Sequence, residues 1–110
     1  MKIFKKLSRS VKGRVAIITG AGSGMGEATA KVFASEGVKV IATDVNQEEV
    51  NRVSTEIITS GGECMPFLLD VTDSASINKC IDATIETYKT LDFVINNAGI
   101  SLSLIHISEP

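Results

Sequence analysis

The chain has 110 residues, a formal net charge of −2 and a hydrophobic fraction of 44%, which together suit one small domain with a packed core. Five of its 11 lysine and arginine residues precede Gly13, so the rest of the chain is acidic, and this argues against nucleic acid as the main partner. Cys64, Cys80 and a single histidine cannot form a metal site, and no apolar run is long enough to cross a membrane. We therefore expect a cytoplasmic protein with reduced cysteines and no metal.

Residues 1–12 form a basic leader without acidic residues, in which apolar residues recur at helical spacing. Such a segment could touch an anionic membrane surface, but it is too short for firm binding. It also lacks the apolar core and the cleavage site of a secretory signal. We expect it to precede the first strand without binding a membrane.

Strand and helix patterns alternate after the leader. Continuous apolar or β-branched runs predict strands over residues 14–19, 38–43, 64–69 and 91–96. Apolar residues at helical spacing predict three helices between these strands, and the first covers residues 24–36. The expected inner faces are Met25, Ala28, Thr29, Val32 and Phe33 in the first helix, Val50, Val53, Ile57 and Ile58 in the second, and Ile77, Ile81, Thr84, Ile85 and Tyr88 in the third.

Turn and cap residues set the limits of these elements. Gly37 is expected to end the first helix, and Asn46 to cap the second with a returning hydrogen bond from Glu49. Thr72 or Asp73 caps the third helix, and Pro66 assigns the first half of the third strand to a sheet edge. The alternation predicts an α/β fold, a Rossmann-type doubly wound parallel sheet in the order 3-2-1-4, truncated after about four strands.

A glycine-rich stretch, TGAGSGMG over residues 19–26, lies between the first strand and the first helix. It does not contain G-x-G-x-x-G but reads T-G-x-x-x-G-x-G, and no Gly-Lys-Ser/Thr follows, which excludes a P-loop. Backbone N–H groups at the start of a helix bind phosphate, and glycines allow a diphosphate to come close. The candidate cofactor-binding residues of this stretch are Gly20, Ser23, Gly24, Met25 and Gly26.

Polar residues also follow the other three strands, namely Asp44, Asp70 and the sequence NNAG over residues 96–99. Carboxyl ends of parallel strands meet at one edge, so we expect these loops to surround one ligand. Asp44 lies 18 residues after Gly26, near the spacing of the acid that binds the adenosine ribose hydroxyls. Its charge would repel the extra phosphate of NADP, and neither Ser23 nor Val45 supplies a cation, so NAD is favoured over NADP.

Over residues 13–101 the glycine pattern, Asp44, Asp70-Val71 and NNAG resemble the short-chain dehydrogenase/reductase family in order and spacing. By this resemblance, Asp70 accepts a hydrogen bond from the adenine amino group and Val71 contacts it through the backbone. The resemblance also implies that the ribose side is lined by Asn96, Ala98 and Gly99. It implies the N-terminal part of an NAD(P)-dependent oxidoreductase that interconverts a small-molecule alcohol and a ketone or aldehyde by hydride transfer, with a homo-oligomeric parent.

The family's catalytic Ser and Tyr-x-x-x-Lys are not found in this sequence. Its only tyrosine, Tyr88, stands four residues before Asp92 rather than a lysine, and on an apolar helix face. We assign no catalytic residue and expect the chain to be inactive alone. Residues 102–110 (LSLIHISEP) resemble an in-frame translation of the transposase adaptor used in sequencing libraries. They are therefore expected to be a non-native tail without function.

Two alternatives remain open. The chain could be a non-catalytic dinucleotide-binding module or a gene remnant, in which case the missing Tyr and Lys are informative. A methyltransferase also places a glycine turn after its first strand and an acid after its second, and it would make Asp70-Val71 and NNAG coincidences.

Overall fold

The computed structural model describes residues 11–97 and the backbone of residues 103–106. Its elements in chain order are β1 (Val15–Ile18), α2 (Gly24–Ser35), β2 (Lys39–Asp44), α3 (Gln47–Thr59), β3 (Glu63–Leu68), α4 (Ser74–Tyr88), β4 (Phe93–Asn96) and β5 (Ser103–His106). Strands and helices alternate through β4, as the sequence predicts. Among the described residues, none of the helices has the length and apolar character that crossing a bilayer demands.

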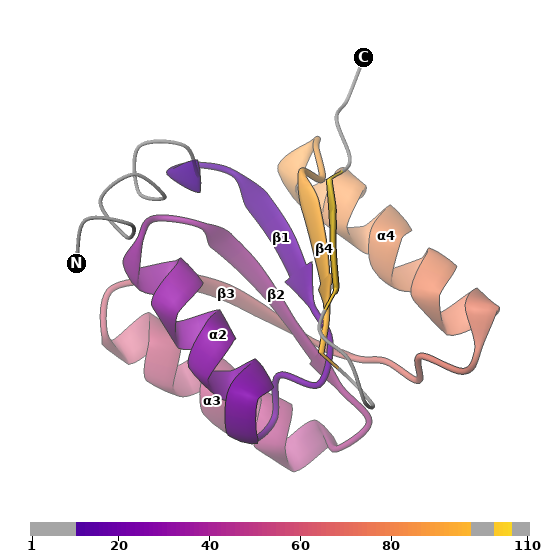
Figure 1. Ribbon diagram of the computed structural model, residues 1–110, viewed down its shortest axis with the longest axis horizontal. Coiled ribbons are helices and arrows are strands. Elements are labelled where there is room, and N and C mark those ends of the chain that lie inside the picture. Colours follow the sequence, from indigo (N-terminus) through magenta and orange to yellow (C-terminus); the bar gives the residue numbers. More distant parts are fainter. Residues whose placement is uncertain (1–10, 98–102, 107–110) are drawn as a thin grey trace.

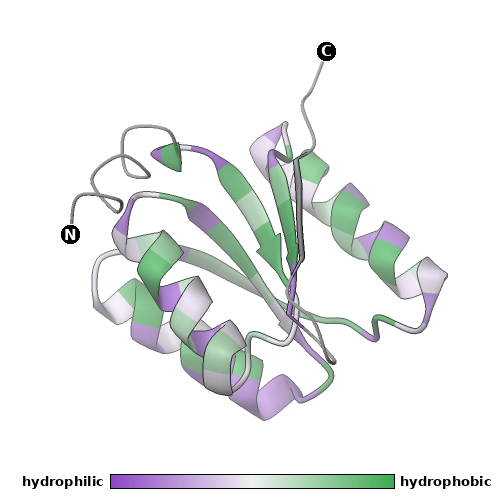
Figure 2. Ribbon diagram, viewed as in Figure 1, coloured by the Kyte–Doolittle hydropathy of each residue, from purple (hydrophilic) through white to green (hydrophobic). Residues whose placement is uncertain are grey.

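The sheet has the order β3-β2-β1-β4-β5, and β1, β2, β3 and β4 pair in parallel (Figure 1). This confirms the predicted doubly wound order 3-2-1-4. Alternate residues of β1 face opposite layers, because successive side chains of a strand point to opposite faces. Ala16 and Ile18 pack in the core under α2 and α3, whereas Val15 and Ile17 pack against α4. Figure 2 shows central strands that are mainly hydrophobic between helices of mixed character.

A fifth strand, β5, joins the sheet within residues 102–110, the segment that the sequence predicts to be a non-native tail. It pairs with β4 in the antiparallel direction, with Ser103 opposite Asn96. An antiparallel neighbour needs only a short connection, unlike the helical crossover between parallel strands. The sequence patterns therefore predict the four parallel strands but not the antiparallel pairing of β5 with β4.

The predicted inner face of α2 is wrong by about one residue. The buried residues of α2 are Gly26, Ala30 and Ala34, whereas Met25 is 66% exposed. Small residues at every fourth position let the helix axis approach the sheet, and this packing outweighs the hydrophobic spacing that starts at Met25. In α3, Val50, Val53 and Ile57 are buried as predicted, but Ile58 is 55% exposed and Ser54 takes its place.

The helix ends follow most of the predicted caps. Gly37 has a φ of 89° after α2, and Asp73 caps α4 by accepting a hydrogen bond from the Ala75 N–H. The Asn46 side chain accepts from the Glu49 N–H at 3.1 Å. Glu49 does not return the expected bond to Asn46, because the Asn46 N–H donates to Asp44 Oδ1 at 3.0 Å and the Glu49 carboxylate pairs with Arg52.

Candidate functional site

The turn from β1 into α2 has the backbone shape that its glycines were expected to allow. We call residues 20–26 the glycine loop. Gly20 and Gly24 have φ values of 64° and 57°, which side chains disfavour. A Cβ atom at Gly26 would collide with the Gly20 carbonyl and lie 2.7 Å from Asn97 Nδ2, whereas a Cβ at Gly24 would meet nothing within 4 Å. Gly26 is thus required for packing, and Gly24 faces open space.

The first turn of α2 begins at the surface. Ser23 is the N-cap residue, but its side chain makes no capping hydrogen bond. Ser23, Gly24 and Met25 are all exposed. The positive end of the helix dipole lies at this turn, beside the open space at Gly24, which is a favourable place for an anionic group.

Asp44 connects the glycine loop with the ends of β2 and β3. Its Oδ2 atom accepts a hydrogen bond from the Gly22 N–H at 2.9 Å, and its carbonyl accepts one from the Leu69 N–H at 3.0 Å. A Cβ at Gly22 would lie 2.8 Å from Asp44 Oδ2, so a side chain at this position would displace the Asp44 carboxylate. Sequence reasoning missed Gly22, although the second glycine of Gly20-Ala21-Gly22 was a visible signal.

Asp70 and Val71 follow β3 at the same edge of the sheet. Asp70 is exposed, and its Oδ1 atom accepts hydrogen bonds from the hydroxyl and the N–H of Thr72 at 2.7 and 2.9 Å. These two bonds lower the pKa of Asp70, so its carboxylate is charged at neutral pH. Val71 is half-buried and packs against the core beneath α4. Thr72 thus binds Asp70 rather than capping α4.

The ends of β1 and β4 are joined through one hydroxyl. Thr19 Oγ1 donates to Asn96 Oδ1 at 2.8 Å and accepts from the Asn97 N–H at 2.9 Å. The Thr19 N–H also donates to the Ile95 carbonyl at 3.0 Å. The predicted residue Asn96 therefore lies beside the start of the glycine loop, while Ala98 and Gly99 lie outside the described residues.

Together these contacts bring four strand ends into one edge. Three features meet at this edge. They are the exposed N-terminus of α2 with open space at Gly24, the Asp44 carboxylate held by the Gly22 N–H, and the polar ends of β3 and β4. This donor and acceptor set fits a dinucleotide, whose diphosphate requires N–H donors and whose ribose hydroxyls require an acceptor.

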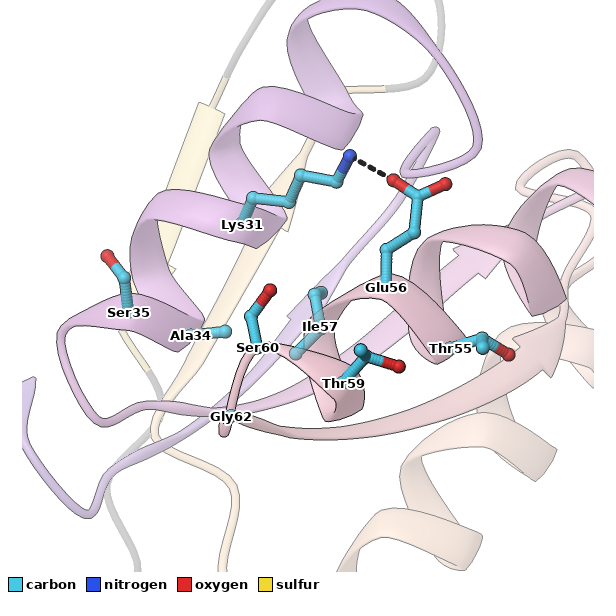
Figure 3. Close-up of a pocket in the computed structure, with 9 residues that line it drawn as sticks. All are labelled: Lys31, Ala34, Ser35, Thr55, Glu56, Ile57, Thr59, Ser60 and Gly62. Atoms are coloured by element: carbon cyan, nitrogen blue, oxygen red, sulfur yellow. Dashed lines mark hydrogen bonds and ion pairs between the residues drawn. The ribbon is translucent and has the colours of Figure 1, made fainter.

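An open groove of about 500 Å³ lies elsewhere, between α2 and α3 (Figure 3). Ala34 and Ser35 line it from the end of α2, and Thr59 and Ser60 from the end of α3. The carbonyl ends of helices carry partial negative charge, so this groove does not suit a phosphate. In residues 11–97, no three potential metal ligands lie close enough to hold an ion.

Tyr88 is the last residue of α4 and packs against the core of the domain. It is half-buried against the core, and Lys39 Nζ lies 5.7 Å from the centre of its ring. Burial, with a smaller effect from Glu63, raises the pKa of Tyr88. A tyrosine that acts as a general base needs the opposite shift, so this environment gives Tyr88 a structural role.

Similar proteins are found both by sequence and by structure. A family model described as short chain dehydrogenase matches residues 14–109. A 2,5-dichloro-2,5-cyclohexadiene-1,4-diol dehydrogenase from Sphingobium indicum is 45% identical over 94 residues, which are 86% of this chain and 38% of that protein. A hydroxysteroid dehydrogenase structure from Escherichia coli has a TM-score of 0.78 at 36% identity, covering 81% of this chain and 37% of its own. A short chain dehydrogenase/reductase from Burkholderia phymatum in complex with NAD has a TM-score of 0.73 at 34% identity, covering 76% and 30%.

Proposed function

The chain belongs to the short-chain dehydrogenase family, and from this membership we propose that it is the N-terminal, NAD-binding part of an oxidoreductase. The chain spans 38% of the length of the relative from Sphingobium indicum. We therefore propose the enzymatic activity for a longer protein of which this chain forms the N-terminal part. That activity is the interconversion of a small-molecule alcohol with a ketone or aldehyde. A bound nicotinamide dinucleotide would supply or accept the hydride.

The observation that carries this proposal is the hydrogen bond from the Gly22 N–H to Asp44 Oδ2 at 2.9 Å. It fixes a carboxylate beside the glycine loop, and the Asn46 N–H holds the other oxygen at 3.0 Å. A fixed carboxylate can accept hydrogen bonds from ribose hydroxyls, but it repels a phosphate on the same ribose. This arrangement supports NAD over NADP.

Membership of this family argues against the methyltransferase alternative. A methyltransferase would bind S-adenosylmethionine, and the match over residues 14–109 excludes that class. A non-catalytic dinucleotide-binding module differs from the proposed function only in lacking turnover. We propose that this chain binds NAD without reducing or oxidising a substrate, because its one tyrosine is the last residue of α4 and packs against the core.

A titration of the chain with NAD, NADP and S-adenosylmethionine tests the proposal. We expect NAD to bind about tenfold or more tightly than NADP, a ratio that corresponds to about 1.4 kcal/mol. Asp44→Ala should remove this preference, whereas Asp82→Ala, which removes an exposed carboxylate of α4, should leave it unchanged. Equal or tighter binding of NADP by the unaltered chain would contradict the proposed NAD preference.

A further inference from the structure

Arg52, in the middle of α3, reaches across 30 positions of sequence to the glycine loop. Its Nη2 atom donates a hydrogen bond to the Gly22 carbonyl at 3.2 Å. The same peptide region is held from the other side, because the Gly22 N–H donates to Asp44 Oδ2 at 2.9 Å. Gly22 is therefore fixed through both its N–H and its C=O groups.

The direction of the Gly22 carbonyl determines the direction of the next N–H group. In a planar trans peptide the C=O of one residue and the N–H of the following residue point in opposite directions. Because the Gly22 carbonyl points to Arg52, the N–H of Ser23 points away from Arg52. Ser23 is the exposed N-cap residue of α2, so this orientation concerns an N–H at the start of the helix.

The guanidinium of Arg52 is itself held in place by three carboxylates. It pairs with Glu27 at 2.9 Å, with Glu49 at 3.2 Å and with Glu56 at 3.0 Å. Glu27 belongs to the first turn of α2 and Glu49 to the first turn of α3. The planar fork of arginine can serve a carbonyl and carboxylates at once, which a lysine ammonium cannot match in geometry.

The glycine loop needs such an external restraint. Gly20 and Gly24, on either side of Gly22, have positive φ values and few conformational restrictions of their own. The Ser23 side chain does not cap α2, so it gives no local restraint. The ion pairs around Arg52 are partly exposed, with 39% of its side chain accessible, and such pairs contribute little to global stability. Their main effect is therefore local.

We propose that Arg52 is a positioning residue for dinucleotide binding, which fixes the Gly22 carbonyl and thereby holds the glycine loop in its phosphate-binding shape. This inference rests on the proposed function. It predicts that Arg52 affects the loop and the ligand affinity more than it affects folding.

The test compares Arg52→Met and Arg52→Lys with Lys31→Met as a matched control. Lys31 pairs with Glu27 at 2.7 Å and with Glu56 at 2.6 Å, but it belongs to the groove side of the network. For both Arg52 variants we expect amide hydrogen exchange at Gly22 to accelerate about tenfold and NAD affinity to fall about tenfold. Lys31→Met should leave both quantities within about twofold of the unaltered chain.

Each outcome decides the inference. An unchanged rate of amide exchange at Gly22 in Arg52→Met would overturn the inference. An equal loss of NAD affinity in Lys31→Met would also overturn it, because the effect would then come from the charge of the ion-pair network and not from the bond to Gly22. Full recovery in Arg52→Lys would show that positive charge suffices and would overturn the role of the fork. If the unaltered chain does not bind NAD, the proposed function fails, and Gly22 exchange still decides whether Arg52 positions the loop.

Discussion

The Thr19 hydroxyl donates a hydrogen bond to Asn96 Oδ1 at 2.8 Å, although the two residues are 77 positions apart in the sequence. The same oxygen accepts from the Asn97 N–H at 2.9 Å. Thr19 is 5% exposed, whereas Asn96 and Asn97 are half-buried, so both bonds are partly shielded from water. One side chain thus aligns the end of β4 with the start of the glycine loop.

Replacing Thr19 by Val should lower the free energy of unfolding by about 1–2 kcal/mol, because the half-buried Asn96 side chain and Asn97 N–H each lose a hydrogen-bond partner. Thr19→Ser is the matched control, since it keeps the hydroxyl and loses one methyl group at a cost of about 0.8 kcal/mol. Urea unfolding followed by circular dichroism measures both values. Equal losses for the two variants would show that the hydroxyl contributes no more to stability than the methyl group, and would contradict the prediction.

Gly26 and Gly24 are glycines for two different reasons, close packing at Gly26 and a positive φ at Gly24. In Gly26→Ala the new methyl group meets the Gly20 carbonyl, a backbone group that cannot turn aside. We expect a loss of about 3 kcal/mol, at the upper end for overpacking. Gly24→Ala meets nothing within 4 Å and has only its φ of 57° to accommodate, so it should lose about 1–2 kcal/mol. Thermal unfolding compares the two, and a Gly26→Ala chain as stable as Gly24→Ala would contradict the close packing.

Acid should weaken the network around Glu27 in a defined range of pH. Hydrogen bonds from Arg52, and then from Lys31, lower the pKa of Glu27 from 4.5 to about 2. The lowered value means that the stabilisation is fully present above pH 4.5 and is lost as the pH falls toward 2. The partners are partly exposed, so the loss should be about 1 kcal/mol or less.

The Glu27→Gln variant supplies the control for this pH dependence. Its stability should lie below that of the unaltered chain at pH 7, and the two should converge as the pH falls from 4.5 toward 2. Urea unfolding at several pH values measures the difference. A constant difference over that range would show that Glu27 keeps the same pKa in the folded and unfolded chains.

The strands and their order could be predicted because their patterns are local and strong. The strand β1 is covered on both faces, by α4 over Val15 and Ile17 and by α2 and α3 over Ile18, and such strands read as continuous apolar runs. The alternation with helices then leaves few topologies open. Asp44, Asp70 and Asn96 could be placed at one edge for the same reason, since each follows a parallel strand.

The inner face of α2 and the role of Arg52 could not be read from local patterns. The buried face of α2 is set by how closely Gly26 approaches Gly20, which is a contact within the folded turn rather than a periodicity. Arg52 resembles any charged residue on the outer side of a helix until the fold brings it to Gly22. The buried face of α2 and the contact of Arg52 both depend on distances between residues in the folded chain, and local sequence patterns do not show such distances.

The position of β4 between β1 and β5 has a topological consequence. A strand has two hydrogen-bonding sides, and those of β4 are taken by β1 in parallel and by β5 in the antiparallel direction. A parallel strand reached through another helical crossover would require the side of β4 that β5 occupies. Continued winding of the sheet and the β4–β5 pairing are therefore mutually exclusive, and a longer chain that continued the parallel series next to β4 would first have to displace β5.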